Sequence, residues 1–257
     1  MPLYHRLLEI SAIVALVGMV AWSAARVTAV FHEGLTYWVL GGVLGGYLLA
    51  DFLSGVVHWG CDRYGSGDTP FLGPNFIVPF REHHVDPKGI TRHDFIETNG
   101  NTCIVAMPFA LSGHFIFDVE SGVGWLLMGH LVLITLCAFT FGTNQFHKWA
   151  HLSPSERGPI VRFLQATKLV LGIKHHKVHH TVPFETYFCI TSGLLNPMLH
   201  RMNFWAGSER LIYKVTGVKA GVDDRKVAGI DEPTDDDRDD DPNAYTGPLS
   251  VEGGLGE

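Results

Sequence analysis

Long apolar stretches alternate with short polar segments along the first 142 residues of the chain. A helix rises about 1.5 Å per residue, so crossing roughly 30 Å of hydrocarbon takes about 20 mostly apolar residues. Four stretches reach or approach that length, and they are residues 7–27, 35–57, 101–117 and 122–142, the third being the shortest. The pattern predicts about four transmembrane helices in an all-α, multi-span membrane helical bundle.

The connecting segments predict how this bundle is oriented. Lys and Arg are frequent after the second and fourth stretches, whereas the connection 118–121 (DVES) has no basic residue. Because cytoplasmic loops are enriched in Lys and Arg, both basic segments and both termini are expected on the cytoplasmic side. Small residues near residue 27 also fit a cleaved signal peptide, but the second apolar stretch follows at once and favours a retained span.

Two later segments are less apolar. Residues 155–175 alternate apolar and basic positions, as in an amphipathic helix at the membrane interface. Residues 187–205 are weakly apolar and contain Pro197, which suits a re-entrant or interfacial segment better than a full span. We therefore expect a cytoplasmic cap built from these segments and from the 58–100 loop.

Composition divides the chain into three parts. The formal net charge is −7, and residues 221–257 hold twelve acidic against three basic residues, which leaves the rest of the chain at roughly +2. A segment so charged and so poor in apolar residues is expected to be a disordered acidic tail. The predicted parts are an N-terminal transmembrane helix with its connection (1–34), a main domain (35–220) and this tail. No nucleic-acid partner is expected.

Histidine is the residue type that stands out. Twelve of the fifteen histidines lie between His58 and His180, and the four cysteines form no CxxC pair. Three pairs have a spacing of four residues, and they are His147 with His151, His175 with His179 and His176 with His180. This spacing places two imidazoles about 5–6 Å apart on one helix face, where they can share a metal. His114 and His130 lie inside predicted spans and are expected to be satisfied polar residues facing other helices.

The number of histidines bears on the kind of metal site. Imidazole suits zinc, copper, iron and nickel alike, so the ligand type leaves the metal open. A single zinc takes three or four protein ligands, whereas about nine or ten histidines gather on the predicted cytoplasmic side, so two metals are the economical count. The HExxH motif of zinc proteases is absent. Two iron ions with open positions for O2 fit an oxidative enzyme acting on a membrane substrate.

The strings around these histidines resemble a known family. DxxSGxxHW, REHHxDP, FIETNGN, NQxHKWAH and HHxxHH together are similar to membrane fatty-acid desaturases, and more narrowly to the plasmanylethanolamine desaturase family, over about residues 50–205. The resemblance implies an oxidoreductase with a diiron centre that uses O2 and two external electrons. Its expected reaction introduces the vinyl-ether double bond of a plasmalogen into an alkyl-ether ethanolamine phospholipid.

The resemblance also implies the site residues. The expected iron ligands are His58, His83, His84, His93, His147, His151, His175, His176, His179 and His180. Asp86 and Asn144 are expected to orient ligating imidazoles, as carboxylate and amide groups do around metal sites. Asp51 and Asp62 could act likewise, although a carboxylate paired with Arg63 at the end of a span is an equal reading.

Several partners and alternatives follow. The glycine run GGVLGG (41–46) lies inside an apolar stretch and favours close helix packing over nucleotide binding, so an external donor of the cytochrome b5 or ferredoxin type, with its reductase, is implied. An acyl-chain desaturase or hydroxylase acting on a membrane phospholipid is the nearest alternative. A metal-binding transporter would place ligands in mid-membrane. The short single-domain chain favours a bacterial inner membrane.

Overall fold

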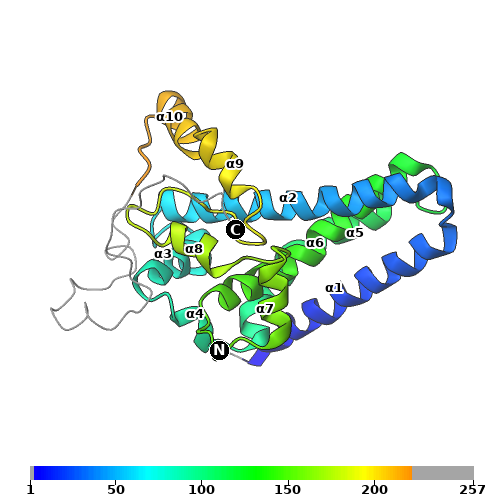
Figure 1. The fold of residues 1–257 in the computed structure, drawn as a ribbon, viewed down its shortest axis with the longest axis horizontal. Coiled ribbons are helices and arrows are strands. Elements are labelled where there is room, and N and C mark those ends of the chain that lie inside the picture. Colours follow the sequence, from blue (N-terminus) through cyan, green and yellow to red (C-terminus); the bar gives the residue numbers. More distant parts are fainter. Residues whose placement is uncertain (1–2, 222–257) are drawn as a thin grey trace.

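The computed structural model describes residues 3–221, and every regular element in that range is helical (Figure 1). In chain order the elements are α1 (Leu3–Val30), η1 (Glu33–Leu35), α2 (Thr36–Arg63), η2 (Gly73–Ile77), α3 (Val78–Val85), α4 (Gly89–Arg92), α5 (Phe95–Ile116), α6 (Gly124–Ala150), α7 (Pro159–Ala166), α8 (Ile173–His179), α9 (Asn196–Arg201) and α10 (Phe204–Thr216). The all-α prediction is confirmed. The predicted tail lies outside the described residues apart from Gly221, so its disorder stays a prediction.

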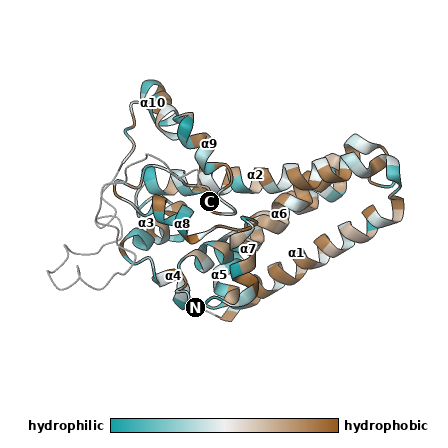
Figure 2. Ribbon diagram, viewed as in Figure 1, coloured by the Kyte–Doolittle hydropathy of each residue, from teal (hydrophilic) through white to brown (hydrophobic). Residues whose placement is uncertain are grey.

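The four long helices α1, α2, α5 and α6 form one elongated bundle. Helix α6 packs against both α2 and α5, and α1 packs mainly against α5. The α1–α2 and α5–α6 connections lie together at one end of the bundle, whereas α3, α4 and α8 gather at the other end (Figure 1). Hydrophilic residues concentrate at the end that carries α3, α4 and α8, which we call the cap (Figure 2).

Three of the long helices are long and apolar enough to cross a membrane, and they are α1, α2 together with η1, and α6. Large apolar side chains on their outer faces are exposed, including those of Val14, Tyr37 and Leu40. Such a continuous apolar surface marks contact with lipid rather than water. The chain is therefore an integral membrane protein. Helix α5 carries polar residues such as Asn99 in its first turns and is not among the helices long and apolar enough to cross a membrane. A fourth span therefore stays a prediction.

Glycines hold α2 close to α6. A Cβ atom at Gly42 would lie 2.7 Å from the Cβ of Leu131, and one at Gly46 would lie 2.5 Å from the carbonyl oxygen of Val132. The predicted packing role of the GGVLGG run is thus seen directly, since two small residues four apart allow helix backbones to approach.

Replacing Gly46 by valine is expected to lower the free energy of unfolding by about 2–3 kcal/mol, because the new side chain would displace the backbone of α6. Thermal unfolding of the detergent-solubilised protein measures the effect. Gly18→Val is the matched control, since a Cβ at Gly18 in α1 has nothing within 4 Å. Equal losses in both variants would contradict close packing as the cause.

The expected amphipathic helix over 155–175 is interrupted. Helix α7 ends at Ala166, Lys168 adopts a positive φ of 60°, and α8 begins only at Ile173. The backbone N–H of Leu171 instead donates to the carbonyl of Thr191. The break turns α8 across the end of the bundle and so brings its histidines over α2 and α6.

Candidate metal centre

Five histidine rings converge in the cap. We call them group A, and they are His83 from α3, His147 and His151 from the end of α6, and His176 and His180 from the end of α8. One nitrogen from each ring lies within 4.8 Å of the others. The Nε2 atoms of His83 and His151 are 2.9 Å apart, and those of His147 and His176 are 2.8 Å apart. Adjacent ligands on a metal with bonds of about 2.1 Å stand roughly 3 Å apart, so these nitrogens are spaced to share one ion.

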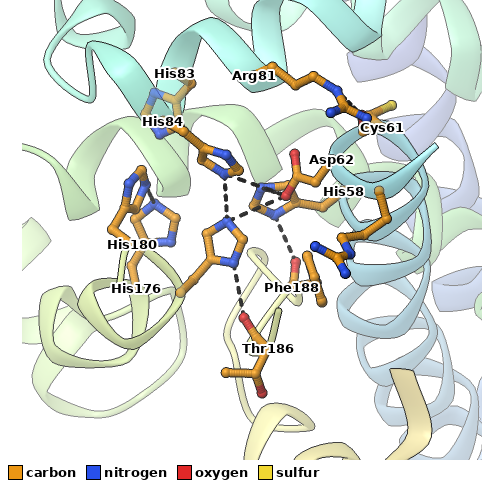
Figure 3. A network of polar contacts seen from close by, with 12 residues as sticks. His58, Cys61, Asp62, Arg81, His83, His84, His176, His180, Thr186 and Phe188 are labelled. Carbon is orange, nitrogen blue, oxygen red and sulfur yellow. Dashed lines mark hydrogen bonds and ion pairs between the residues drawn. The ribbon is translucent and has the colours of Figure 1, made fainter. Parts of the chain in front are cut away.

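A second cluster, group B, consists of His58 and Asp62 from α2, His84 from α3 and His179 from α8. Asp62 Oδ2 lies 3.2 Å from Nε2 of His58 and 3.5 Å from Nε2 of both His84 and His179. The Nε2 atoms of His84 and His179 are 3.0 Å apart (Figure 3). Three imidazoles and one carboxylate oxygen therefore face a common point.

Groups A and B lie side by side because adjacent residues of one helix enter different groups. His83 belongs to group A and His84 to group B, and the same holds for His180 and His179. The ring centroids of His179 and His180 are 5.4 Å apart. Metals held in the two groups would be neighbours, as a two-metal centre requires.

Two backbone carbonyls orient the imidazoles of group B. His58 Nδ1 donates to the carbonyl of Phe188 at 3.0 Å, and His179 Nδ1 donates to the carbonyl of Thr186 at 2.9 Å (Figure 3). A histidine that donates through one nitrogen presents the other as a lone pair. Both rings are thereby set to present Nε2 to a metal.

Residues 186–196, which we call the strap, provide these carbonyls and run back along α2. Asp51 of α2 is fully buried and anchors the strap. Its carboxylate accepts hydrogen bonds from the backbone N–H groups of Ser192 at 2.7 Å, Gly193 at 2.8 Å and Leu195 at 3.1 Å. The segment predicted to be re-entrant or interfacial thus packs inward against a long helix and positions ligands from there.

Burial lowers the pKa of several imidazoles in groups A and B. It lowers the pKa of His83, His176 and His180 well below the usual value, and neighbouring histidines add to the effect. Burial likewise lowers the pKa of His151 and His179 to about 3. A neutral imidazole keeps the lone pair that binds a metal, so at physiological pH protons do not compete for these nitrogens.

Comparison with known proteins identifies the family. The lipid desaturase domain matches residues 47–223, which is more than half of the chain. The chain belongs to the lipid desaturase family. It is 43% identical to the plasmanylethanolamine desaturase of Myxococcus xanthus, over 85% of this chain and 76% of that protein. It is 47% identical to plasmanylethanolamine desaturase 1 of the mouse, over 74% of this chain and 70% of that protein.

More distant relatives extend the comparison. The chloroplastic fatty acid desaturase 4-like 2 of Arabidopsis thaliana is 32% identical over 77% of this chain and 72% of that protein. No solved structure gives a significant match. As a lipid desaturase the chain is a membrane oxidoreductase that acts on a lipid, and groups A and B form a histidine-rich centre able to bind metal.

Two of the ten predicted histidine ligands lie outside both groups. The side chain of His93 is about half exposed at 53%, and its Nδ1 lies 3.2 Å from a carboxylate oxygen of Glu97. The ring of His175 lies on another face of α8, where its centroid is 5.6 Å from that of Tyr187. The other eight histidines meet in groups A and B.

The two residues predicted to orient imidazoles also point elsewhere. Asp86 forms an ion pair with Arg92 near the surface. Asn144 donates to the carbonyl of Thr98 at 3.1 Å and so joins α6 to α5. Neither makes a hydrogen bond to a group A or group B ring among the contacts of residues 3–221. Strap carbonyls take that role for His58 and His179.

Two residues gain importance from the structure. Asp62, considered above as an orienting group or as an ion-pair partner of Arg63, presents its oxygen to three group B imidazoles, and the signal for it is its spacing of four from His58 in HWGCD. Arg81 is fully buried and donates from Nε to the carbonyl of Cys61 at 3.0 Å and from Nη2 to that of Tyr64 at 3.3 Å. It therefore caps the end of α2 that carries group B.

The histidines inside the spans form a separate polar network. Ser23 Oγ lies 3.2 Å from Nε2 of His114 and 3.0 Å from Nε2 of His130. His130 Nδ1 also donates to the carbonyl of Gly113 at 2.9 Å. The prediction of satisfied polar residues facing other helices is confirmed.

Proposed function

We propose that this chain is a plasmanylethanolamine desaturase, which turns the alkyl ether of a plasmanyl phospholipid into the vinyl ether of a plasmalogen. The observation that carries the proposal is the pair of adjacent histidine groups at one end of a membrane bundle. It is supported by 43% and 47% identity to two proteins of that name. Vinyl-ether formation removes two hydrogens from neighbouring carbons and therefore needs an oxidant. A two-metal centre held by groups A and B would activate that oxidant.

Two iron ions are the proposed cofactor. Group A would hold one through five imidazoles, and group B the other through three imidazoles and Asp62. Imidazole-rich donor sets accept iron, and iron is the metal through which O2 is activated for attack on an unactivated carbon chain. In the overall balance the lipid loses two hydrogens, and O2 combines with them, two protons and two external electrons to give two waters.

The side chains of the cap have distinct tasks in this scheme. Burial excludes bulk water from six of the eight rings, whereas His84 and His180 are partly buried. The carbonyls of Phe188 and Thr186 fix the orientation of His58 and His179. Asp62 contributes negative charge beside group B, which offsets the positive charge of a bound cation.

The electrons are proposed to come from an external donor of the cytochrome b5 or ferredoxin type with its reductase. This is supported by the packing of Gly42 and Gly46 against α6, which gives the glycine run a structural role. The cap is proposed to face the cytoplasm of a bacterial cell from its inner membrane. Its support is the density of Lys and Arg in the segments that build the cap.

Desaturation of an acyl chain is the second candidate. The 32% identity to a fatty acid desaturase 4-like protein favours it over the remaining alternatives. Hydroxylation would begin with the same hydrogen removal and would leave a hydroxyl group on the lipid. Transport of a metal is disfavoured, because groups A and B lie at one end of the bundle instead of at its centre.

Lipid mass spectrometry with acid cleavage tests the function. A plasmalogen-deficient host supplied with alkyl-ether lipid and a working electron donor would express the wild type, His176→Ala or His175→Ala. We expect acid-labile plasmenyl lipid with the wild type, none with His176→Ala because it loses a group A ring, and near wild-type amounts with His175→Ala. Unchanged ether lipid with wild-type protein present in the membrane would contradict the substrate. Loss of product with His175→Ala would contradict the ligand set.

A further inference from the structure

A cavity of about 500 Å³ lies beside group B. It is lined by residue 178 of α8, by residues 181–183 and 185–187, which lead from α8 into the strap, and by residues 199, 200 and 203–206, where α9 passes into α10. Thr186 lines the cavity, and its carbonyl is the one that holds His179 Nδ1 at 2.9 Å. Thr186 therefore both lines the cavity and orients a ring of group B.

One side of this cavity has the chemistry that recognises an ammonium group. The carboxylate of Glu185 and the rings of Tyr187, Phe204 and Trp205 all line it. A carboxylate forms charge-assisted hydrogen bonds with a primary ammonium, and aromatic faces attract cations. Among the residues of 3–221 that line the cavity, Glu185 is the one Asp, Glu, Lys or Arg.

The remaining polar groups of the cavity suit a phosphate. His200 lines the cavity, and its Nδ1 lies 2.9 Å from Thr186 Oγ1, so its other ring nitrogen, Nε2, takes no part in that contact. The amide of Asn203 lines the same wall, immediately before the first turn of α10. Hydrogen-bond donors and a carboxylate in the lining of one cavity match a zwitterion that carries phosphate and ammonium.

The position of the cavity agrees with the depth of lipid headgroups. Helices α9 and α10 lie beside α2, outside the long bundle and towards the cap (Figure 1). Met202, Leu211 and Val215 of this region expose apolar side chains. Amphipathic helices with such an apolar face typically lie in the membrane interface, which would place the residues of α9 and α10 that line the cavity near the level of headgroups.

The proposed reaction requires the lipid headgroup to lie close to the metals. The bond that becomes a vinyl ether adjoins the ether oxygen, so only the glycerol backbone separates it from the phosphate. An enzyme that oxidises this bond must hold the headgroup directly beside its metal centre. Oxidation of a bond in the middle of an acyl chain would not require the headgroup to lie beside the metal centre.

We propose that this cavity binds the phosphoethanolamine headgroup of the lipid substrate, with Glu185 selecting the primary ammonium. The inference rests on the proposed function for the identity of the lipid, but it concerns binding and has its own test. Glu185 also pairs with Arg63 at 3.0 Å, and Arg63 pairs in addition with Glu209, which does not line the cavity. Glu209→Gln therefore disturbs the same arginine and leaves the cavity carboxylate in place.

Binding of defined lipids to the metal-loaded protein is the experiment. Native mass spectrometry, without an electron donor so that no turnover occurs, would compare alkyl-ether phosphatidylethanolamine with alkyl-ether phosphatidylglycerol of identical chains. We expect the wild type to bind the ethanolamine lipid about tenfold more tightly, corresponding to one charge-assisted hydrogen bond. Glu185→Gln should lower the preference to within about twofold, whereas Glu185→Asp and Glu209→Gln should keep it.

Each outcome decides the proposal. Equal binding of both lipids by the wild type, or a preference that survives in Glu185→Gln, would overturn it. Loss of preference in Glu209→Gln but not in Glu185→Gln would assign selectivity to Arg63 and would also overturn it. Failure of the proposed function is distinguishable, because the ethanolamine preference would then persist while no acid-labile lipid forms in cells.

Discussion

Asp62→Asn is expected to leave the purified protein with about one iron per chain instead of two and to lower desaturation at least about a hundredfold. Asp62 provides the only carboxylate oxygen in groups A and B, within 3.5 Å of three imidazole nitrogens. Asparagine keeps the shape of the side chain and removes its negative charge. A cation in group B would then face three neutral rings and no compensating anion, whereas group A would keep all five rings.

Elemental analysis of iron per chain, together with the acid-cleavage lipid assay, measures this effect. The matched control is Asp86→Asn, which removes a carboxylate from the REHHVDP string next to His84. Because Asp86 pairs with Arg92 near the surface, this variant should keep two irons and near wild-type product. Two irons in Asp62→Asn, or the loss of iron in Asp86→Asn, would contradict the assignment of group B.

Asp51→Asn is expected to lower the free energy of unfolding by about 2 kcal/mol and to weaken metal binding in group B. In the wild type Oδ1 accepts from Ser192 and Gly193, and Oδ2 accepts from Leu195. In asparagine an NH2 group takes the place of either Oδ1 or Oδ2. At least one buried backbone N–H then faces a donor instead of an acceptor. The strap then shifts, and with it the carbonyls that orient His58 and His179.

Thermal unfolding with and without an iron chelator separates the two parts of this prediction. Ser54→Ala is the graded comparison, since Ser54 Oγ accepts a single strap N–H, that of Ile190, and its loss should cost about 1 kcal/mol. The iron content of each variant is measured by elemental analysis. A wild-type iron content in Asp51→Asn would mean that the strap does not position group B. Destabilisation by Ser54→Ala equal to that by Asp51→Asn would mean that the carboxylate has no special part in anchoring it.

The sequence predicted the helical bundle well because apolar periodicity over twenty residues is a strong and local signal. The stretch 7–27 lies within α1, and 35–57 and 122–142 lie within α2 and α6 except for their first one or two residues. The sequence was less informative for 155–175, where the apolar and basic alternation continues through a break at Lys168. Lys168 has a positive φ of 60°, and the chain that follows it pairs with the strap through Leu171 and Thr191, twenty residues apart.

Two of the three histidine pairs with a spacing of four lie within group A, and the third pair is divided. A separation of four residues puts two side chains on one face of a helix, which is why His147 and His151 entered the same group. The same rule paired His175 with His179, yet α8 turns one towards Tyr187 and the other towards Asp62. Local spacing predicts which residues share a helix face, but it does not predict which other elements that face packs against.

The amino-acid sequence by itself determined the membrane bundle, the richness in imidazole at the span ends and the family to which these strings belong. All three rest on interactions between near neighbours in the chain or on recognisable local strings. Only the tertiary structure decided that eight of the ten predicted histidines divide between two groups, that Asp62 completes one of them and that Asp51 anchors the strap. Those relations join residues as much as 144 positions apart. They depend on how α2, α3, α6 and α8 pack, which no periodicity within a single helix contains.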